Sequence, residues 1–229
     1  MRRRHPLLIG HRGAAACAPE STGASIRRAR ALGVDMIELD VQVTADDRLV
    51  IFHDDRVDRT TNGRGPLARF RYAQLARLDA GGWFSPAFAG ERVLLVSEAI
   101  RLIRPPCRIN LELKSTAKPA RLISQLVHSL RRAKAGPRVL VSSFDPSLLA
   151  RMQRAGPGIA RAIGLSCVAL HPHVSLVTPP LVDRVHRAGL RLHVWTVDRL
   201  RDARRLLTMG VDGIVTNRPD RIGPALRGA

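Results

Sequence analysis

Two carboxylates and an imidazole stand close together in one part of the chain. Glu38 and Asp40 are two residues apart within an apolar run, so in a β-strand both side chains leave the same face. The next apolar run ends at His53, and the residues between the runs are typical of a turn. A tight hairpin that pairs Thr44 with Leu49 would place His53 directly opposite Asp40. The stretch predicts a metal or catalytic site, or else merely the solvated face of a strand.

Further residues that could bind anions or transfer protons stand at the ends of other predicted strands. His11 and Arg12 directly follow a short apolar run near the N-terminus, and Trp195 ends a later one. Glu112 and Lys114 lie two residues apart in another run and share one face. Because the carboxyl ends of parallel strands meet at one end of a barrel, we expect these side chains to converge.

The order of the predicted elements indicates the fold. Buried strands alternate with capped helical segments, a pattern typical of βαβ units. The main alternative is an open doubly wound sheet, but no Gly-x-Gly-x-x-Gly follows the first strand. With the return strand of the hairpin set aside, we expect a (β/α)8 TIM barrel whose parallel strands lie around residues 8, 38, 111, 141, 163, 169, 193 and 214.

The segment from residue 54 to 93 interrupts this alternation. It is rich in arginine, glycine and proline, contains scattered aromatic residues, and predicts at most one short helix, around Tyr72 to Leu78. It is too long for an idle connection, so we interpret it as a functional insertion or lid. We expect one domain over residues 1–229, with this insertion after the second strand.

The chain is strongly basic. Its 38 basic residues, of which all but three are arginines, outnumber 19 acidic ones, giving a net charge of +19. Such a charge suits a protein that binds nucleic acid or anionic membranes, which remains the alternative from a different functional class. However, the arginines are spread over nearly every predicted helix, and aromatic residues make up only 3%, too few for stacking on single strands. We interpret the charge mainly as a bias towards arginine that also draws in anionic substrates.

Cysteine usage and hydropathy indicate the compartment. Cys17, Cys107 and Cys167 are odd in number and far apart, which is typical of reduced thiols. The apolar run after the basic N-terminus is broken at His11, too early for a signal peptide. No run approaches the roughly 18 apolar residues of a membrane span. We therefore expect a soluble, cytoplasmic protein; its oligomeric state is left open.

The chain resembles the glycerophosphodiester phosphodiesterase family in eight motifs that occur in the same order and cover nearly its whole length. The motifs are His11-Arg12-Gly13, Pro19-Glu20-Ser21-Thr22, Glu38-Leu39-Asp40-Val41, His53-Asp54, Arg59-Thr60-Thr61-Asn62-Gly63, Glu112-Leu113-Lys114, Trp195-Thr196-Val197 and Gly210-Val211-Asp212-Gly213-Ile214-Val215-Thr216. The resemblance implies a barrel of the phospholipase C-like type. It also implies hydrolysis of glycerophosphodiesters to glycerol 3-phosphate and an alcohol, usually with a divalent cation.

The resemblance also implies the chemical roles. Glu38, Asp40 and Glu112 correspond to metal ligands, and His11 and His53 to the catalytic pair. Three carboxylates suit a hard cation such as Mg²⁺ or Ca²⁺. Two histidines with pKa values near neutrality can exchange the roles of general base and general acid.

Four more residues are expected around the substrate. Arg12 and Lys114 would hold the nonbridging phosphate oxygens. Glu20 would support Arg12, or else merely favour a helix N-terminus. Trp195 would line the substrate pocket, with packing in the core as the alternative. Whether water attacks directly or a cyclic phosphate forms first is left open.

A second enzymatic interpretation is a lysophospholipid-type phosphodiesterase. The aromatic part of the insertion around Trp83 and Phe84 would then form a lip that faces lipid. The chain also departs from the usual residues of the family at three positions, with Ser21, Asp198 and Asn217 in place of Asn, Asn and Asp. None of the three is an expected ligand or acid–base residue, so we expect activity to be kept and the alcohol side of the pocket to differ.

Overall fold

Eight parallel strands close into a barrel. The computed structural model describes residues 5–156, 160–162 and 168–228. Around the barrel the strands follow the order β1-β9-β8-β7-β6-β5-β4-β2, and β1 also pairs with β2, which completes the circle. The barrel strands are β1 (Leu7–His11), β2 (Met36–Val43), β4 (Arg108–Leu113), β5 (Val139–Ser142), β6 (Ala160–Ala162), β7 (Ala169–Leu170), β8 (Arg191–Val194) and β9 (Gly213–Thr216). The expected (β/α)8 barrel is confirmed.

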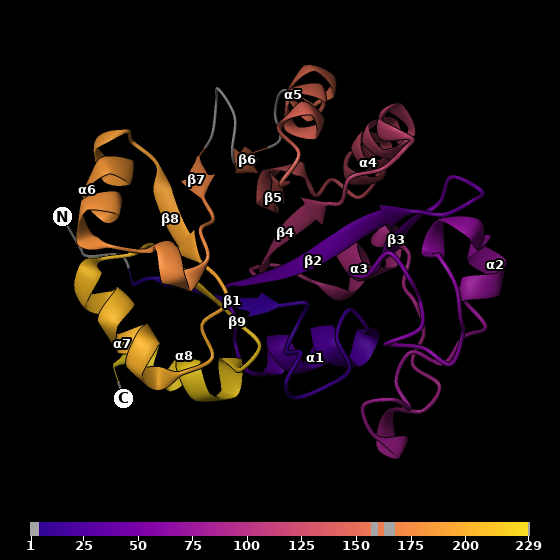
Figure 1. Cartoon of the computed structure of the whole chain (residues 1–229), viewed down its shortest axis with the longest axis horizontal. Coiled ribbons are helices and arrows are strands. Elements are labelled where there is room, and N and C mark those ends of the chain that lie inside the picture. Colours follow the sequence, from indigo (N-terminus) through magenta and orange to yellow (C-terminus); the bar gives the residue numbers. More distant parts are fainter. Residues whose placement is uncertain (1–4, 157–159, 163–167, 229) are drawn as a thin grey trace.

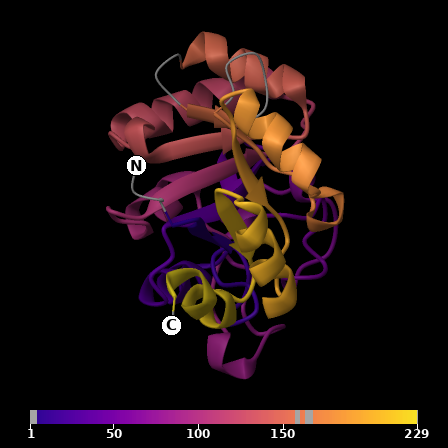
Figure 2. The same ribbon diagram turned by 90° about the vertical axis from the view of Figure 1, so that its left-hand side faces the viewer.

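Helices surround the strands on the outside of the barrel (Figure 1). Turning the molecule brings α6, α7 and α8 to the front of the strands (Figure 2). The fifth predicted strand, residues 161 to 165, overlaps β6, but its second half lies outside the described residues. The helices are α1 (Gly23–Ala31), α2 (Tyr72–Leu75), α3 (Val96–Leu102), α4 (Pro119–Arg132), α5 (Pro146–Ala155), α6 (Pro179–Arg187), α7 (Leu200–Met209) and α8 (Pro219–Arg227).

The two faces of β2 show how the sequence pattern builds the barrel. Ile37, Leu39 and Val41 belong to the apolar layer between strands and helices and are fully buried. Burial of each such side chain contributes about 1.5–3 kcal/mol, which helps to offset the cost of placing acids inside the barrel. Glu38 and Asp40 alternate with them and are also buried, with exposed fractions of 5% and 2%. The acids therefore do not form a solvated strand face.

The hairpin after β2 differs from its expected register by one residue. Strand β3 (Leu49–Ile51) pairs antiparallel with β2, with Val43 opposite Leu49. The backbone N–H of Thr44 donates to the carbonyl of Arg48 at 3.0 Å, and Asp47 adopts a left-handed φ of 59°. A three-residue loop with a left-handed residue at its end is a common hairpin connection, and here it replaces the longer loop that we expected.

This register moves His53 away from its predicted position. Phe52, not His53, lies opposite Asp40, and the N–H of Phe52 donates to the carbonyl of Asp40 at 3.0 Å. The prediction of a direct cross-strand pair between His53 and Asp40 was therefore wrong. His53 instead follows the end of β3, where the side-chain amide of Gln42 donates to the carbonyls of residues 52, 53 and 54.

The insertion is a packed segment beside the barrel, with α2 at its outer side (Figure 1). It contains α2 and the two 3-10 helices η1 (Leu67–Arg69) and η2 (Pro86–Phe88). The helix expected at Tyr72 to Leu78 is thus present but shorter. The insertion and β3 share a small core of their own, made of Val50, Phe52, Val57, Leu67, Leu75, Ala80 and Val93.

Gly13, in the loop after β1, cannot take a side chain without displacing Ser25. Its φ is +93°, and a Cβ would lie 2.3 Å from Oγ of Ser25. That hydroxyl donates to the carbonyl of Arg12 and accepts from the N–H of Ala14, both at 2.8 Å. We expect Gly13→Ala to lower the free energy of unfolding by at least about 2 kcal/mol, measured by urea denaturation, because strain and overpacking add.

Gly90→Ala is the matched control for this change. Gly90 has a similar φ of +89°, but nothing lies within 4 Å of the position of its Cβ. Gly90→Ala should lower the free energy of unfolding only through the strain of the left-handed conformation, by about 1 kcal/mol. Equal decreases in the free energy of unfolding of the two variants would show that the contact with Ser25 is unimportant.

Candidate active site

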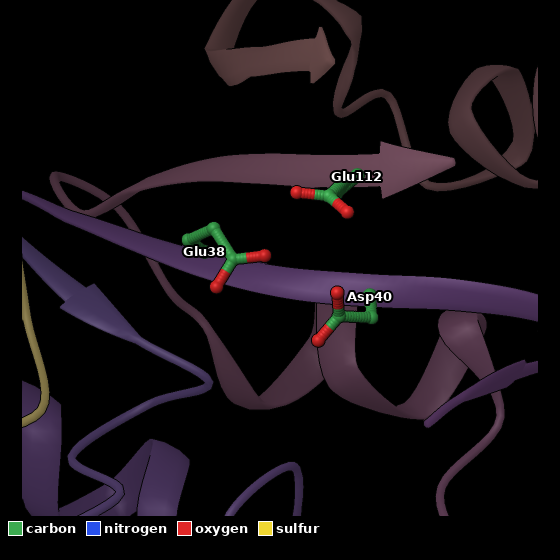
Figure 3. Close-up of side chains that lie close together, drawn as sticks. All are labelled: Glu38, Asp40 and Glu112. Atoms are coloured by element: carbon green, nitrogen blue, oxygen red, sulfur yellow. The ribbon is translucent and has the colours of Figure 1, made fainter. Parts of the chain in front are cut away.

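Three carboxylates from two neighbouring strands of the barrel converge. Glu38 and Asp40 come from β2 and Glu112 from β4, where Glu112 is the register partner of Asp40. Their side chains point towards one another (Figure 3), and one ligand atom from each lies within 4.8 Å of the other two. Among the described residues this is the one group of three or more histidines, cysteines and acids that could hold a metal ion.

Two oxygens of this cluster fit a cation. Oε1 of Glu38 and Oδ2 of Asp40 are buried and have no hydrogen-bond partner. Burial, followed by repulsion from Asp40 and Glu112, raises the pKa of Glu38 well above its ordinary value. Buried carboxylates that lack partners and repel one another are costly unless a positive charge joins them. The donor set consists of oxygens only, which hard divalent cations prefer.

Lys114 and Arg12 supply positive charge beside the cluster. Nζ of Lys114 lies 2.8 Å from Oδ1 of Asp40 and 2.5 Å from Oε1 of Glu112. Burial would lower the pKa of Lys114, but these two acids outweigh it and raise the pKa. The backbone N–H of Arg12 donates to Oε2 of Glu38 at 3.1 Å. Nε of Arg12 lies 3.6 Å from Oδ2 of Asp40, within reach of charge attraction but too far for a hydrogen bond.

His11 ends β1 and is held in one tautomer. Its Nδ1 lies 2.7 Å from Oδ1 of Asn217, whose Nδ2 donates to Oδ2 of Asp198 at 2.7 Å. Because that second bond makes Oδ1 of Asn217 the acceptor, Nδ1 of His11 must donate. Nε2 of His11 then carries a free lone pair and lies 3.9 Å from Oε2 of Glu38. Burial, followed by the charge of Arg12, lowers the pKa of His11.

His53 lies at the mouth of the same pocket, with 33% of its side chain exposed. Its Nδ1 lies 2.6 Å from Oδ1 of Asp54. A hydrogen bond from Arg59 is the main reason that the pKa of Asp54 falls to about 2, so this carboxylate is ionised and accepts from His53. The arrangement leaves Nε2 of His53 for the substrate side, as in other histidines oriented by a carboxylate.

Glu20 accepts hydrogen bonds from two arginines, Arg12 and Arg59. Its Oε1 accepts from Nη1 of Arg12 at 2.8 Å and from Nη2 of Arg59 at 2.7 Å. Burial alone would raise the pKa of Glu20, but the hydrogen bonds and charges of Arg59 and Arg12 lower it. Glu20 does not lie within α1, whose cap is formed by the side chain of Thr22.

The pocket has a polar half and an aromatic half. The polar residues that line its cavity of about 160 Å³ include His11, Arg12, Glu38, Asp40, His53, Glu112 and Lys114. The aromatic lining residues are Trp195, Phe144 and His171. Nε1 of Trp195 donates to the carbonyl of His171 at 2.9 Å, and the rings of Trp195 and Phe144 meet edge to face at 5.8 Å. Phe144 is 68% exposed, an unusual position for a large apolar side chain.

Phe144, which lines this pocket, escaped sequence reasoning. Phe144 stands just after a predicted strand, in the position that singled out Trp195, so it could have been found by the same rule. His171 lies 3.0 Å from His193, and burial is the main cause that lowers the pKa of His171 to about 4 and that of His193 to about 3. Conversely, Trp83 and Phe84 do not line this pocket but stack edge to face on each other at 5.7 Å.

The departures at residues 198 and 217 form part of the site. Asp198 accepts from the hydroxyl of Thr216 and from both the backbone N–H and the side-chain amide of Asn217. Asn217 in turn contacts His11. The pair therefore supports the histidine of β1, a role that their spacing in the chain did not reveal.

Comparison with known proteins assigns the family. The glycerophosphoryl diester phosphodiesterase family matches residues 11–221. The chain belongs to this family. It is 36% identical to the glycerophosphodiester phosphodiesterase of Caldanaerobacter subterraneus subsp. tengcongensis, over 94% of this chain and 96% of the relative. It is 30% identical to such an enzyme from Bacillus subtilis, over 93% and 84%.

A solved structure supports the same assignment. A phosphodiesterase from Oleispira antarctica, in complex with the product sn-glycerol-3-phosphate, has a TM-score of 0.91 and 31% identity, with 97% of each chain covered. The expected family, barrel and class of enzyme, a phosphoric diester hydrolase, are thus confirmed.

Among the described residues, no helix is both long and apolar enough to cross a membrane.

Proposed function

We propose that this chain acts as a single catalytic domain that hydrolyses glycerophosphodiesters to glycerol 3-phosphate and an alcohol, with a divalent cation and two histidines. The observation that carries the proposal is the convergence of three acids and two histidines on one pocket. The product complex of the Oleispira antarctica relative supports glycerol 3-phosphate as the shared product. The net charge of +19 would draw such anionic substrates towards the site.

The cation would be held by Glu38, Asp40 and Glu112. The unpaired buried oxygens of Glu38 and Asp40 support this assignment, and the oxygen-only donor set of the three acids favours Mg²⁺ or Ca²⁺. When bound, the cation would neutralise negative charge on the phosphate. Arg12 and Lys114 flank the acids and would hold the nonbridging oxygens, whose charge they stabilise in the transition state.

The two histidines would divide the proton transfers. His11 presents a free lone pair at Nε2 and has a lowered pKa, which suits acceptance of the proton from the attacking hydroxyl. His53, held by ionised Asp54, would carry a proton on Nε2 and donate it to the oxygen of the departing alcohol. The P–O bond to that alcohol breaks as the new P–O bond forms.

The aromatic half of the pocket would contact the organic part of the substrate. Trp195 and Phe144 offer apolar faces beside the polar half. Because Phe144 is exposed, a lysophospholipid is the second candidate substrate. Its acyl chain would extend out of the pocket over Phe144. The lip of lipid-facing aromatics would then be at Phe144 rather than at Trp83.

A substrate panel tests the proposal. Purified protein is incubated with glycerophosphocholine, glycerophosphoethanolamine, glycerophosphoglycerol and a lysophosphatidylcholine, and release of glycerol 3-phosphate or lysophosphatidic acid is measured. We expect turnover with at least one diester, loss of turnover in excess chelator, and recovery on addition of Mg²⁺ or Ca²⁺. Undiminished turnover in the chelator would refute the role of the cation.

The same panel separates the alternatives. Turnover of the lysophospholipid alone would assign the second substrate class. If no diester is hydrolysed, while duplex DNA or anionic vesicles are bound with an affinity that falls steeply with salt, the binding function would replace the enzymatic one.

A further inference from the structure

We propose that Arg59, in the insertion, is a positioning residue that links the proton-transferring His53 to the phosphate-binding Arg12. The inference rests on the proposed function and adds a residue to its machinery. Arg59 belongs to the motif Arg59-Thr60-Thr61-Asn62-Gly63, to which the proposed chemistry assigns no role.

The guanidinium of Arg59 bridges two carboxylates. Its Nε and Nη2 donate to the two oxygens of Asp54, at 2.6 and 3.0 Å. Its Nη1 and Nη2 donate to the two oxygens of Glu20, at 2.8 and 2.7 Å. Both contacts are bidentate, the geometry that gives an arginine–carboxylate pair its directional specificity. All three nitrogens of the guanidinium are thus engaged, and the planes of the two carboxylates are set by one residue.

Each of these carboxylates holds one residue of the site. Asp54 accepts from Nδ1 of His53 at 2.6 Å, and Glu20 accepts from Nη1 of Arg12 at 2.8 Å. The result is a continuous series of charge-assisted contacts in which His53 and Arg12 are the two ends and Arg59 is the middle. A displacement of Arg59 would therefore reach both ends at once.

The charges explain why the middle member matters. Glu20 and Asp54 are both ionised, because hydrogen bonds and charges of their partners lower both pKa values. Only 11% of the side chain of Glu20 is exposed, so its negative charge is poorly solvated. Without Arg59, Glu20 would keep Arg12 as its cation while Asp54 would keep only His53. We expect both carboxylates to rotate, since each loses two of its donors.

Simple surface pairing does not account for this arrangement. Isolated exposed ion pairs contribute little to stability and rarely fix a geometry. Arg56 offers such a pair in the same insertion, with Nη2 at 2.9 Å from Oδ1 of Asp58 and 59% of its side chain exposed. Arg59 has a similar exposure of 46% but contacts two carboxylates, each of which contacts a residue of the site. Arg56→Met is therefore the matched control for Arg59→Met.

The kinetic signature is specific. Asp54→Asn should lower mainly kcat, because His53 loses its orienting carboxylate, whereas Glu20→Gln should raise mainly KM, because Arg12 is misplaced. Arg59→Met should both lower kcat and raise KM, each by about 10- to 100-fold. Small misplacement of reacting groups has effects of this size. Arg59→Lys should recover one effect but not both, because a single ammonium cannot serve two bidentate partners.

A mutant cycle tests the proposal. Turnover of the best diester and calorimetric binding of glycerol 3-phosphate are measured for wild type, Arg59→Met, the double variant Asp54→Asn/Glu20→Gln, and the triple variant. We expect Arg59→Met alone to lower turnover and to weaken binding of glycerol 3-phosphate. Added to the double variant, it should lower turnover by less than about a further twofold, as coupled residues do. Arg56→Met should behave like wild type.

Three outcomes would overturn the proposal. In the first, Arg59→Met matches Arg56→Met. In the second, Arg59→Met lowers turnover as much in the double variant as it does in wild type. In the third, kcat falls only in proportion to the fraction of folded protein, as measured by circular dichroism, and KM stays unchanged. If Arg59→Met does not fold, the same cycle with Arg59→Lys decides. An inactive wild type refutes the proposed function instead, and binding of glycerol 3-phosphate still reports on the link to Arg12.

Discussion

Replacing His53 with alanine is expected to lower kcat by about 10²- to 10⁴-fold for a diester with an alkyl alcohol, the usual contribution of general acid–base catalysis. The alkoxide of such an alcohol is a poor leaving group unless it receives a proton. His53 is only partly buried, so the variant should fold and keep its affinity for glycerol 3-phosphate. The rate of alcohol release, followed by a coupled assay, checks this expectation.

The choice of leaving group separates the two histidines. A diester of glycerol 3-phosphate with 4-nitrophenol releases an anion that needs no proton. We expect His53→Ala to be much less harmful with this substrate, whereas His11→Ala should remain severely impaired, because the attacking hydroxyl still has to lose its proton. Equal losses for His53→Ala with both substrates would argue against its role as the acid.

Glu38→Gln is expected to abolish activation by the cation and to lower turnover by more than about 100-fold, because a neutral amide is a weak ligand. Without the cation the same variant should be as stable as wild type or more stable. The reason is that Glu38 is buried against Asp40 and Glu112, and repulsion and burial raise its pKa. The amide removes this repulsion and can still accept from the N–H of Arg12. Sites built for function commonly carry such a cost in stability.

Thermal unfolding with and without the cation measures both effects. In wild type, Mg²⁺ or Ca²⁺ at 100 times its Kd should add about 2.7 kcal/mol of stability, whereas Glu38→Gln should show no such increase. Asp183→Asn, which changes an exposed acid on α6, is the matched control and should respond like wild type. An equal response in Glu38→Gln would exclude Glu38 as a ligand.

Much of the site follows from local patterns in the chain. The alternation of Glu38 and Asp40 with Leu39 and Val41 places the two acids on one face of a strand whatever surrounds it. A strand-and-helix alternation then predicts a barrel, and a barrel collects strand ends at one opening, which is why His11 and Glu112 could be expected beside them. These inferences need only the period of two along a strand and the direction of the strands.

The register of the hairpin lies beyond such patterns. His53 was expected opposite Asp40, but the loop closes one residue earlier, with Thr44 bonded to Arg48. Hairpin loops of three and of four residues are both common, and in this loop the hydroxyl of Thr44 donates to Asp46. A shift of one residue reverses the face of every later side chain, so this small difference moved His53.

By itself, the sequence determined which residue types reach the barrel opening, because strand periodicity and strand direction are local properties. Only the tertiary structure decided which partners they meet there. Asn217 contacts His11 because β1 pairs with β9, and Glu20 meets Arg59 because the insertion folds back towards the loop after β1. These contacts join residues far apart in the chain and depend on closure of the barrel, which no local pattern encodes.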